Sequence, residues 1–400
     1  LNLRFGDEDS LRGKSTAVEA LGSALRMGTE KLDEQELNDR LDELNANVAI
    51  QSARQSLNIS IETKRDKLID ALDVIRQILR EPSFPADKFE LYKEQALSEL
   101  DSQLQDPQAL ARLVVLRALN SYDRGDIRYE STIEEHIEDM KALKLDDVKA
   151  LHANFLSGSE GEVAVVGDFD PAEVEEKLNA MLANWKSSTP YQRAAVAPNV
   201  GLKTPIKTVQ TPDKANSVYF ASQQYALRDD DPNYAPLLMA NYVLGGGTLS
   251  SRLGDRVRQK EGLSYGIMSM LRAHPIDEYG SLSVMAIANP ENRDKLISSI
   301  DEEVRNLVKD GVTEKELKDN VESFLQTQKL TRSRDGGLAN LLAMNLFAGR
   351  DMSFYERLEG QIAALTVKDV NQAIEEYIDP DQFVIATAGD FAKPTPAPKR

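Results

Sequence analysis

Apolar and polar residues along the chain follow two different periods. Apolar residues recur every three or four positions over Leu37–Leu44 and Leu68–Leu79, which predicts two amphipathic helices. Between them the residues alternate over about 46–53 and 57–62, which predicts the two strands of a hairpin. Asp33 is followed three residues later by a Glu, as in a capping box, so we expect the first helix to begin there.

The same order of elements is written twice, at an offset of about 220 residues. Arg65–Ile69 reads Arg-Asp-Lys-Leu-Ile, and Arg293–Ile297 repeats it letter for letter. Ala142–Val148 likewise matches Ala364–Val370, and each of these segments opens a helical pattern. We therefore expect an internal duplication, with two units of similar structure.

Both copies are predicted to contain a hairpin and to end on an apolar strand. The second hairpin is expected at about 263–271 and 280–288. The final strands are expected at Val163–Val166 and Phe383–Ala388, each followed directly by Gly-Asp-Phe. Strands grouped in hairpins with blocks of helices between them predict an α+β fold, in which each unit has a mixed, mostly antiparallel sheet with helices on one face.

The segment Ser187–Pro205, before the second copy, lacks any period and contains three prolines, which is typical of a linker. We therefore divide the chain into a first unit at 1–190, a linker at 191–205 and a second unit at 206–400. Four hundred residues agree with two units of this size.

Composition excludes several classes of protein. The formal net charge is −18, and an acidic surface repels the phosphates of nucleic acids and anionic lipids. The longest apolar run, Leu338–Ala348, is too short to span a membrane. Cysteine is absent, so disulfides, thiolate nucleophiles and cysteine-based zinc sites are excluded. The chain begins with Leu and shows no signal-peptide pattern, so we expect a trimmed or partial sequence.

Two short motifs resemble known catalytic or binding sequences but lack the required context. Arg12–Thr16 reads Arg-Gly-Lys-Ser-Thr, yet Glu8 stands where a phosphate-binding loop needs its first glycine. We interpret this segment as a loop that leads into a helix. Gly262–Gly266 matches the Gly-x-Ser-x-Gly elbow around Ser264, but here a helix precedes the turn and a strand follows it, the reverse of the required order.

The histidines do not form a metal site. His136, His152 and His274 offer no pair four residues apart, and a catalytic zinc needs about three nitrogen or oxygen ligands. We therefore expect this chain to bind no metal and no cofactor of its own.

The segment Leu244–Tyr265 carries the most specific signal. It contains three glycines, Gly245–Gly247, and later Arg258 and Tyr265, which lie seven residues apart. Tyr265 is the last residue of a Gly-Leu-Ser-Tyr sequence. In this it resembles the second domain of the pitrilysin and insulysin group of inverted-zincin peptidases, which includes the mitochondrial processing peptidase subunits. Subunits of that group are also built from two similar α+β units.

The resemblance implies a role for Arg258 and Tyr265. Such an Arg and Tyr reach into the zinc-bearing domain, where they hold the substrate backbone and the developing oxyanion. A guanidinium and a phenol are suitable donors for this purpose. The alternative is structural: Arg258 pairs with Asp255 or Glu261 on the helix surface, and Tyr265 packs on the sheet.

The glycines leave two interpretations open. Gly246 and Gly247 contact substrate as part of a flexible loop, or the triple glycine simply ends a helix, because glycine tolerates positive φ.

The resemblance also shows what this chain lacks. The family's catalytic half carries His-x-x-Glu-His on a helix before Gly-Thr, with a Glu further along as the third zinc ligand. Here Glu19 replaces the first His, Gly22 the general base and Ser23 the second His, and Glu99 stands at the distance of the third ligand. This degenerate site cannot hold zinc.

We therefore expect the non-metal half of a two-part zinc peptidase, inactive alone. Its partner is expected to be a subunit or domain with His-x-x-Glu-His that binds the zinc, and its substrate a peptide or unfolded polypeptide. The resemblance favours the bacterial periplasm over the cytoplasm. Two alternatives are a scaffold or peptide-binding protein of the same fold without a catalytic share, and a serine hydrolase acting through Ser264.

Overall fold

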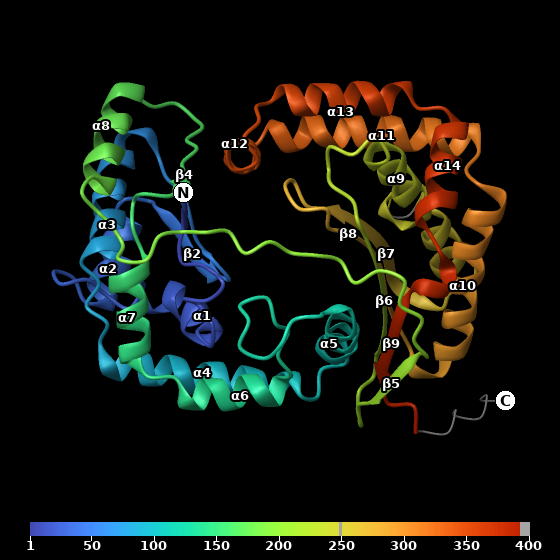
Figure 1. The fold of residues 1–400 in the computed structure, drawn as a ribbon, viewed down its shortest axis with the longest axis horizontal. Helices are drawn as coiled ribbons and strands as arrows, with labels where there is room; N and C mark the ends of the chain where they lie inside the picture. Colours follow the sequence, from blue (N-terminus) through green and yellow to red (C-terminus); the bar gives the residue numbers. More distant parts are fainter. Residues whose placement is uncertain (248–249, 393–400) are drawn as a thin grey trace. The chain divides into compact units, whose positions relative to one another are not determined.

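The computed structural model describes residues 1–247 and 250–392, which divide into two compact units (Figure 1). Both units contain helices and a sheet, so the predicted α+β class is confirmed. Neither unit is one continuous stretch of chain. Unit 1 comprises residues 1–101, 122–194 and 331–351, and unit 2 comprises residues 102–121, 195–330 and 352–400.

Unit 1 is built around a four-stranded antiparallel sheet with the strand order β2-β3-β1-β4. The predicted hairpin is present, and Asn47 of its first strand pairs with Glu62 of its second. The elements of this unit are β1 (Asn2–Arg4), α1 (Ser15–Ala24), α2 (Glu34–Glu43), β2 (Asn47–Ala53), β3 (Ser56–Glu62), η1 (Arg65–Lys67), α3 (Leu68–Arg80), α4 (Ala86–Gln103), α6 (Ile133–Ala142), α7 (Leu145–Phe155), β4 (Gly161–Glu162), α8 (Pro171–Leu182) and α12 (Asp335–Phe347).

Helices of unit 1 bury the inner face of this sheet. Leu57 and Ile59 point inward from β3, whereas Asn58 and Ser60 between them are exposed. This alternation follows from the two-residue period of a strand. Asp33 forms the predicted capping box, because its side chain accepts a hydrogen bond from the N–H of Glu36 and the Glu36 carboxylate accepts one in return.

Unit 2 is built around a five-stranded sheet with the order β5-β9-β6-β8-β7. All pairs are antiparallel except β5 and β9, and β7 forms one edge. The elements of this unit are α5 (Pro107–Leu119), β5 (Lys207–Gln210), β6 (Ser217–Tyr225), α9 (Tyr234–Asn241), η2 (Tyr242–Gly246), η4 (Gly254–Lys260), β7 (Ser264–Ala273), β8 (Gly280–Ala288), η5 (Pro290–Asn292), α10 (Arg293–Asp310), α11 (Glu314–Arg332), α13 (Ser353–Ala364), α14 (Val367–Tyr377), η6 (Pro380–Gln382) and β9 (Val384–Gly389).

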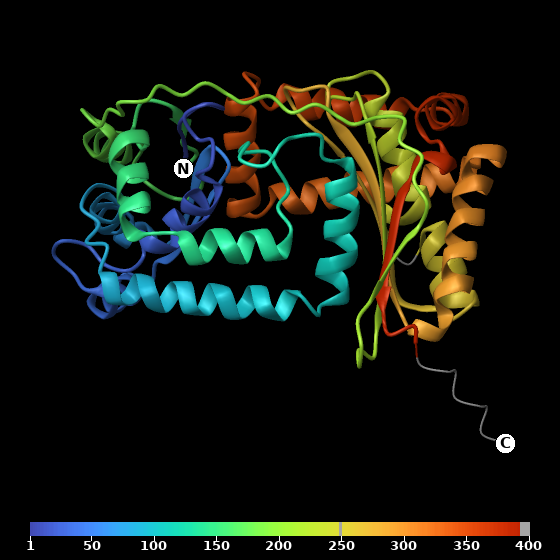
Figure 2. The same cartoon turned by 60° about the horizontal axis from the view of Figure 1, so that its bottom comes forward.

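Helices cover both faces of the unit 2 sheet (Figure 2). Every residue of β6 is therefore buried. Tyr219 and Ala221 belong to the larger core, which includes residues of α9, α10, α11, α13 and α14. Val218 and Phe220 alternate with these two residues along the strand. They therefore point to the opposite face of the sheet, where they pack with Ala111, Val115 and Leu119 of α5.

Each unit includes one helix from the other half of the sequence. Helix α5 lies in the first half of the chain but packs against β6 and β9 of unit 2. Helix α12 lies in the second half but belongs to unit 1, where the Arg4 guanidinium stacks 3.6 Å from the centre of the Phe347 ring. The compact units therefore do not coincide with the predicted segments 1–190, 191–205 and 206–400. That division stays a prediction about the duplicated sequence.

The repeated sequence segments lie at corresponding places in the two units. In unit 1 Arg65 forms an ion pair with Asp168 of the first Gly-Asp-Phe, with 2.6 Å between Nη1 and Oδ1. In unit 2 the matching Arg293 stacks on Phe391 of the second Gly-Asp-Phe, 4.7 Å from the ring centre. In both units an arginine at the start of a helical segment thus contacts the Gly-Asp-Phe segment.

One predicted strand is wrong. Val163–Val166 is not a strand, and β4 comprises only Gly161 and Glu162. The register explains the difference. Gly161 and Glu162 pair with Leu3 and Asn2 of β1, and the ladder between β1 and β4 comprises only these two pairs. The corresponding strand of unit 2, β9, is present and pairs with β5 on one side and with β6 on the other.

Candidate functional site

Tyr265 lies at the start of the edge strand β7, in a β-bulge. Ser264 pairs with Ala288 and Gly266 pairs with Ile287, so Tyr265 is the extra residue between them. A bulge turns its side chain away from the regular alternation of the strand. The ring is 62% exposed, and its hydroxyl donates a 2.7 Å hydrogen bond to Oδ1 of Asn289.

Ser264 stabilises this bulge. Its hydroxyl lies 2.7 Å from the carbonyl oxygen of Gly266 and 2.8 Å from that of Ile287, and it accepts a hydrogen bond from the N–H of Gly266. The residue is only 7% exposed. A hydroxyl used by the backbone in this way is poorly placed to attack a substrate, so the geometry favours a structural role for Ser264.

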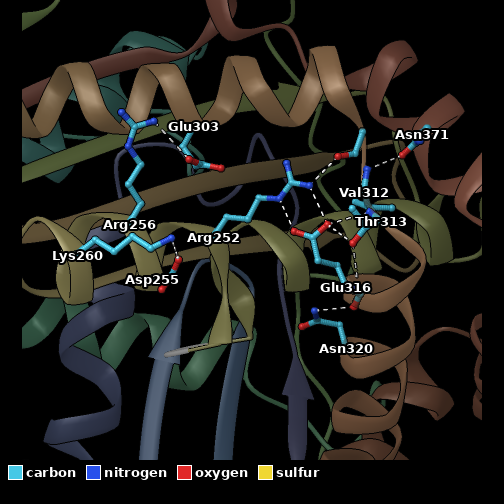
Figure 3. A network of polar contacts seen from close by, with 11 residues as sticks. Arg252, Asp255, Arg256, Lys260, Glu303, Val312, Thr313, Glu316, Asn320 and Asn371 are labelled. Atoms are coloured by element: carbon cyan, nitrogen blue, oxygen red, sulfur yellow. Dashed lines mark hydrogen bonds and ion pairs between the residues drawn. The ribbon is translucent and has the colours of Figure 1, made fainter.

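Arg258 lies on η4, a π-helical segment, and its side chain is exposed. Both acidic residues offered as its alternative partners are engaged elsewhere. Asp255 pairs with Lys260, 2.6 Å away (Figure 3). Glu261 pairs with Arg256 at 3.1 Å. Within residues 1–247 and 250–392, no ion pair or side-chain hydrogen bond is found for the Arg258 guanidinium. It is therefore available to an external group.

A bidentate ion pair fixes the chain just before η4. Nε and Nη2 of Arg252 lie 2.6 and 2.8 Å from the two carboxylate oxygens of Glu316 on α11, and Nη2 also donates to the carbonyl of Gly311 (Figure 3). Burial raises the pKa of Glu316, but hydrogen bonds from Arg252 and Thr313 outweigh it and lower this pKa to about 2. The carboxylate thus stays charged, as a bidentate anchor requires.

A second network fixes the other end of η4 to α10. The Glu261 carboxylate accepts a 2.6 Å hydrogen bond from the Ser299 hydroxyl and pairs with Arg256. Arg256 also pairs with Glu302 and Glu303, the latter at 3.4 Å. Three carboxylates surround this one guanidinium, so η4 is held to α10 along its length.

A short turn carries the chain from η4 into β7. Gly262 has φ of +63°, a conformation that glycine adopts without steric cost. The N–H of Leu263 donates to the carbonyl of Val257 at 2.9 Å and closes the turn. Arg258 and Tyr265 are therefore presented by two elements that contact each other, η4 and β7.

The three glycines are closely packed. A Cβ on Gly245 would lie 2.6 Å from the backbone nitrogen of Ser269, and one on Gly246 would lie 2.5 Å from Nδ2 of Asn241. A Cβ on Gly247 would lie 2.6 Å from Oδ1 of Asn320. A Cβ on Gly247 would also lie 2.8 Å from the carbonyl oxygen of Tyr242, so packing against the backbone requires glycine at Gly245 and Gly247. Substrate contact by Gly246 and Gly247 stays a prediction.

We predict that Gly245→Ala lowers the free energy of unfolding by about 1–3 kcal/mol, because the added methyl must displace the backbone of β7. Gly360→Ala is the matched control, since Gly360 lies in the exposed middle of α13 with open space around it. That control is expected to gain about 0.5–1 kcal/mol from helix propensity. Urea unfolding of both variants measures these changes. A free energy of unfolding that changes in the same direction in both variants would contradict the packing argument.

In unit 1 an ion pair occupies the position of the family's first zinc-binding histidine. Glu19 on α1 lies 2.9 Å from Nε2 of His136 on α6. The hydrogen bond to Glu19 raises the pKa of His136, although partial burial opposes it. Tyr92 of α4 lies close enough to Glu19 that this charge, together with burial, raises the pKa of the phenol.

Gly22 brings α1 directly onto β2. A Cβ there would lie 3.0 Å from the carbonyl oxygen of Ile50 and from the backbone nitrogen of Ser52. Gly245 packs on β7 of unit 2 in the same way. The residue that replaces the general base is thus one of a pair of equivalent packing glycines.

The residues of the degenerate motif do not fit a zinc ion. Ser23 and Glu99 are exposed, on α1 and α4 respectively, and Gly22 has no side chain. In the part of the chain that the structure describes, no three His, Asp or Glu side chains gather closely enough to hold a metal. No helix of those same residues is long and apolar enough to cross a membrane.

The pairing of His136 with Glu19 makes stability depend on pH. Because the folded state raises the pKa of His136, the pair stabilises the fold below the ordinary pKa of 6.5 and ceases to do so as the pH rises through the folded value. We predict that Glu19→Gln loses more stability at pH 6 than at pH 8. Denaturant unfolding at the two pH values measures this, and a larger loss at pH 8 would contradict it.

The other two histidines are used by the backbone. Nε2 of His152 lies 2.8 Å from the carbonyl of Leu79, and Nδ1 of His274 accepts from the N–H groups of Ile276 and Asp277. Together with the pairing of His136, each of the three histidine rings thus contacts a partner within the chain.

The sequence did not indicate which residues hold the segments of Arg258 and Tyr265 in place. Asn289, Glu316 and Ser299 come from segments far from both in sequence. Asn289 directly precedes Pro290 at the end of an alternating strand, a signal that identifies a turn but not a partner for Tyr265.

Two sequence models of one peptidase family match the chain in succession. The model described as insulinase, peptidase family M16, matches residues 7–127. The model described as the peptidase M16 inactive domain matches residues 142–324.

Similar proteins and structures extend over nearly the whole chain. A Helicobacter pylori protein named non-peptidase homolog YmxG is 21% identical over 395 residues, which cover 98% of this chain and 89% of that protein. A peptidase M16 inactive domain from Pseudomonas fluorescens is 22% identical with a TM-score of 0.79, covering 100% of this chain and 93% of that one. The periplasmic protease PqqL from Escherichia coli is 16% identical with a TM-score of 0.70, covering 97% and 42%. Structures at these identities establish the shared fold.

Proposed function

Because the chain belongs to the peptidase M16 (insulinase) family, we propose that it is the non-metal half of a two-part zinc peptidase. In this proposal Arg258 and Tyr265 act on a peptide held by a partner half that carries His-x-x-Glu-His. The observation that carries the proposal is the exposed Arg258, whose neighbouring carboxylates are all paired with other cations. The exposed phenol in the bulge supports it.

The chemistry of the two side chains suits peptide hydrolysis. The Arg258 guanidinium offers several N–H donors in a fixed plane, so it can hold a peptide carbonyl. The Tyr265 hydroxyl can donate to the oxygen that becomes negative when the carbonyl is attacked. Donors that are fixed beforehand stabilise that charge without having to reorganise.

The proposal assigns the metal to the partner. The residues at Glu19, Gly22, Ser23 and Glu99 do not fit zinc, so this chain supplies no metal-bound water and no general base of its own. What it contributes is the binding and orientation of the peptide and the stabilisation of charge. The two proteins together would form the complete site.

We also propose the bacterial periplasm as the compartment. The support is the likeness to PqqL, which is described as a periplasmic protease.

The function is tested by mixing the purified chain with a His-x-x-Glu-His subunit from the same genome and following cleavage of a quenched fluorescent peptide. We expect cleavage by the mixture and little by either protein alone. Binding of the peptide or subunit without any gain in rate would favour the scaffold alternative. Labelling of this chain alone by a fluorophosphonate would favour the serine hydrolase.

A further inference from the structure

The side chain of Asn289 is used in an unusual way for its place in the fold. It lies between the end of β8 and η5, at the N-cap of that short helix, where Asn normally accepts a hydrogen bond from the helix N–H groups. Asn289 makes no such bond. Its Oδ1 accepts from the Tyr265 hydroxyl instead, at 2.7 Å.

This hydrogen bond connects two strands at the bulge. Tyr265 is the unpaired residue of β7, and Asn289 directly follows Ala288, which pairs with Ser264. The exposed ring has little packing around it, so a hydrogen bond to its hydroxyl is the contact that limits its rotation. Asn292 offers a comparison, because it lies at the same corner but donates to the backbone carbonyl of Leu263, 3.4 Å away, whereas the Tyr265 hydroxyl donates to Asn289.

We infer that Asn289 is a positioning residue for Tyr265, which holds the phenol at the place where it meets the substrate carbonyl. The inference rests on the proposed function of Tyr265. A neutral amide suits this task because it accepts the hydroxyl proton weakly, so the hydroxyl can turn to a developing oxyanion. A carboxylate at the same place would keep the proton and repel the negative charge.

A negative charge at position 289 distinguishes a positioning role of Asn289 from a merely structural one. Asn289→Asp has nearly the same shape and still accepts a hydrogen bond, so a structural role would tolerate it. A positioning role would not. Asn289→Leu removes the acceptor altogether and leaves the ring free to rotate.

The experiment measures kcat and KM of the assembled pair on a quenched peptide for four single variants and two double variants. The singles are Tyr265→Phe, Asn289→Asp, Asn289→Leu and, as the matched control, Asn292→Asp. The doubles combine each Asn289 variant with Tyr265→Phe. Thermal unfolding of every variant controls for folding.

We expect Asn289→Leu to lower kcat about 10-fold and Asn289→Asp to lower it at least as much, with KM changed less than about 2-fold. Both effects should disappear when Tyr265 is already Phe. We expect the control to stay within about 2-fold.

Three results would overturn the inference. The first is an unchanged kcat in both Asn289 variants while Tyr265→Phe is impaired. The second is an equal loss with and without the Tyr265 hydroxyl, which would indicate a structural effect. The third is normal activity of Tyr265→Phe, which would remove both the inference and the proposed role of Tyr265.

Discussion

Arg258→Ala is expected to lower turnover of the assembled pair by about 10²- to 10³-fold, or about 2.7–4 kcal/mol of transition-state stabilisation. The reason is that the Arg258 guanidinium is exposed and its acidic neighbours are paired elsewhere, so its removal costs an external contact rather than an internal one. For the same reason the stability of the chain should hardly change. Initial rates with a quenched peptide and thermal unfolding measure the two quantities.

Lys260→Ala is the matched control for Arg258. Lys260 is another exposed cation on the same π-helical segment, but it is paired with Asp255 at the surface. We expect its loss to change turnover less than about 2-fold, since surface ion pairs contribute little. If both variants lost turnover equally, the positive charge of the segment and not the placed guanidinium would be responsible.

Glu316→Gln is expected to lower the free energy of unfolding at pH 7 by about 2–3 kcal/mol. Glu316 anchors Arg252 with both oxygens, and the pair is mostly buried, with 16% and 29% of the two side chains exposed. The shift of the Glu316 pKa from 4.5 to about 2 corresponds to roughly 3 kcal/mol at neutral pH. The amide would leave the Arg252 charge without its counterion.

The Glu316 carboxylate also makes the free energy of unfolding depend on pH in the acid range. Its folded pKa is lowered, so its contribution is complete above the ordinary value of 4.5 and is lost as the pH falls toward 2. The wild type should therefore lose stability over that range more steeply than Glu316→Gln. Glu322→Gln, an exposed change on the same helix, should follow the wild type. Identical acid profiles for all three would contradict the account.

Residue periods were sufficient to predict the hairpins and the main helices. These features depend on local alternation, as at Leu57 and Ile59, which the two-residue period of a strand imposes directly. The capping box at Asp33 is equally local, since its two hydrogen bonds join residues three apart.

Contacts between segments that are distant in the chain could not be predicted from the sequence. Helix α5 shows the right apolar residues for burial, but nothing in its pattern indicates that Ala111 and Val115 pack on β6 and on β9, which is far later in the chain. Val163–Val166 fails for a similar reason: an apolar run becomes a strand only where a partner continues beside it.

The candidate site was predicted in part. Spacing and resemblance identified Arg258 and Tyr265, and the structure places both on adjacent elements with exposed side chains. The bulge at Ser264 could not be foreseen, because a bulge depends on the register against β8. The pairing of Tyr265 with Asn289 follows from that register and was equally hidden.

Metal content measured together with cleavage tests the central claim most directly. The purified chain and its His-x-x-Glu-His partner are each analysed for zinc by mass spectrometry and assayed on the same peptide, separately and mixed. The account predicts about one zinc in the partner, essentially none in this chain, and cleavage only after mixing. One zinc per molecule of this chain, with cleavage by the chain alone, would contradict it.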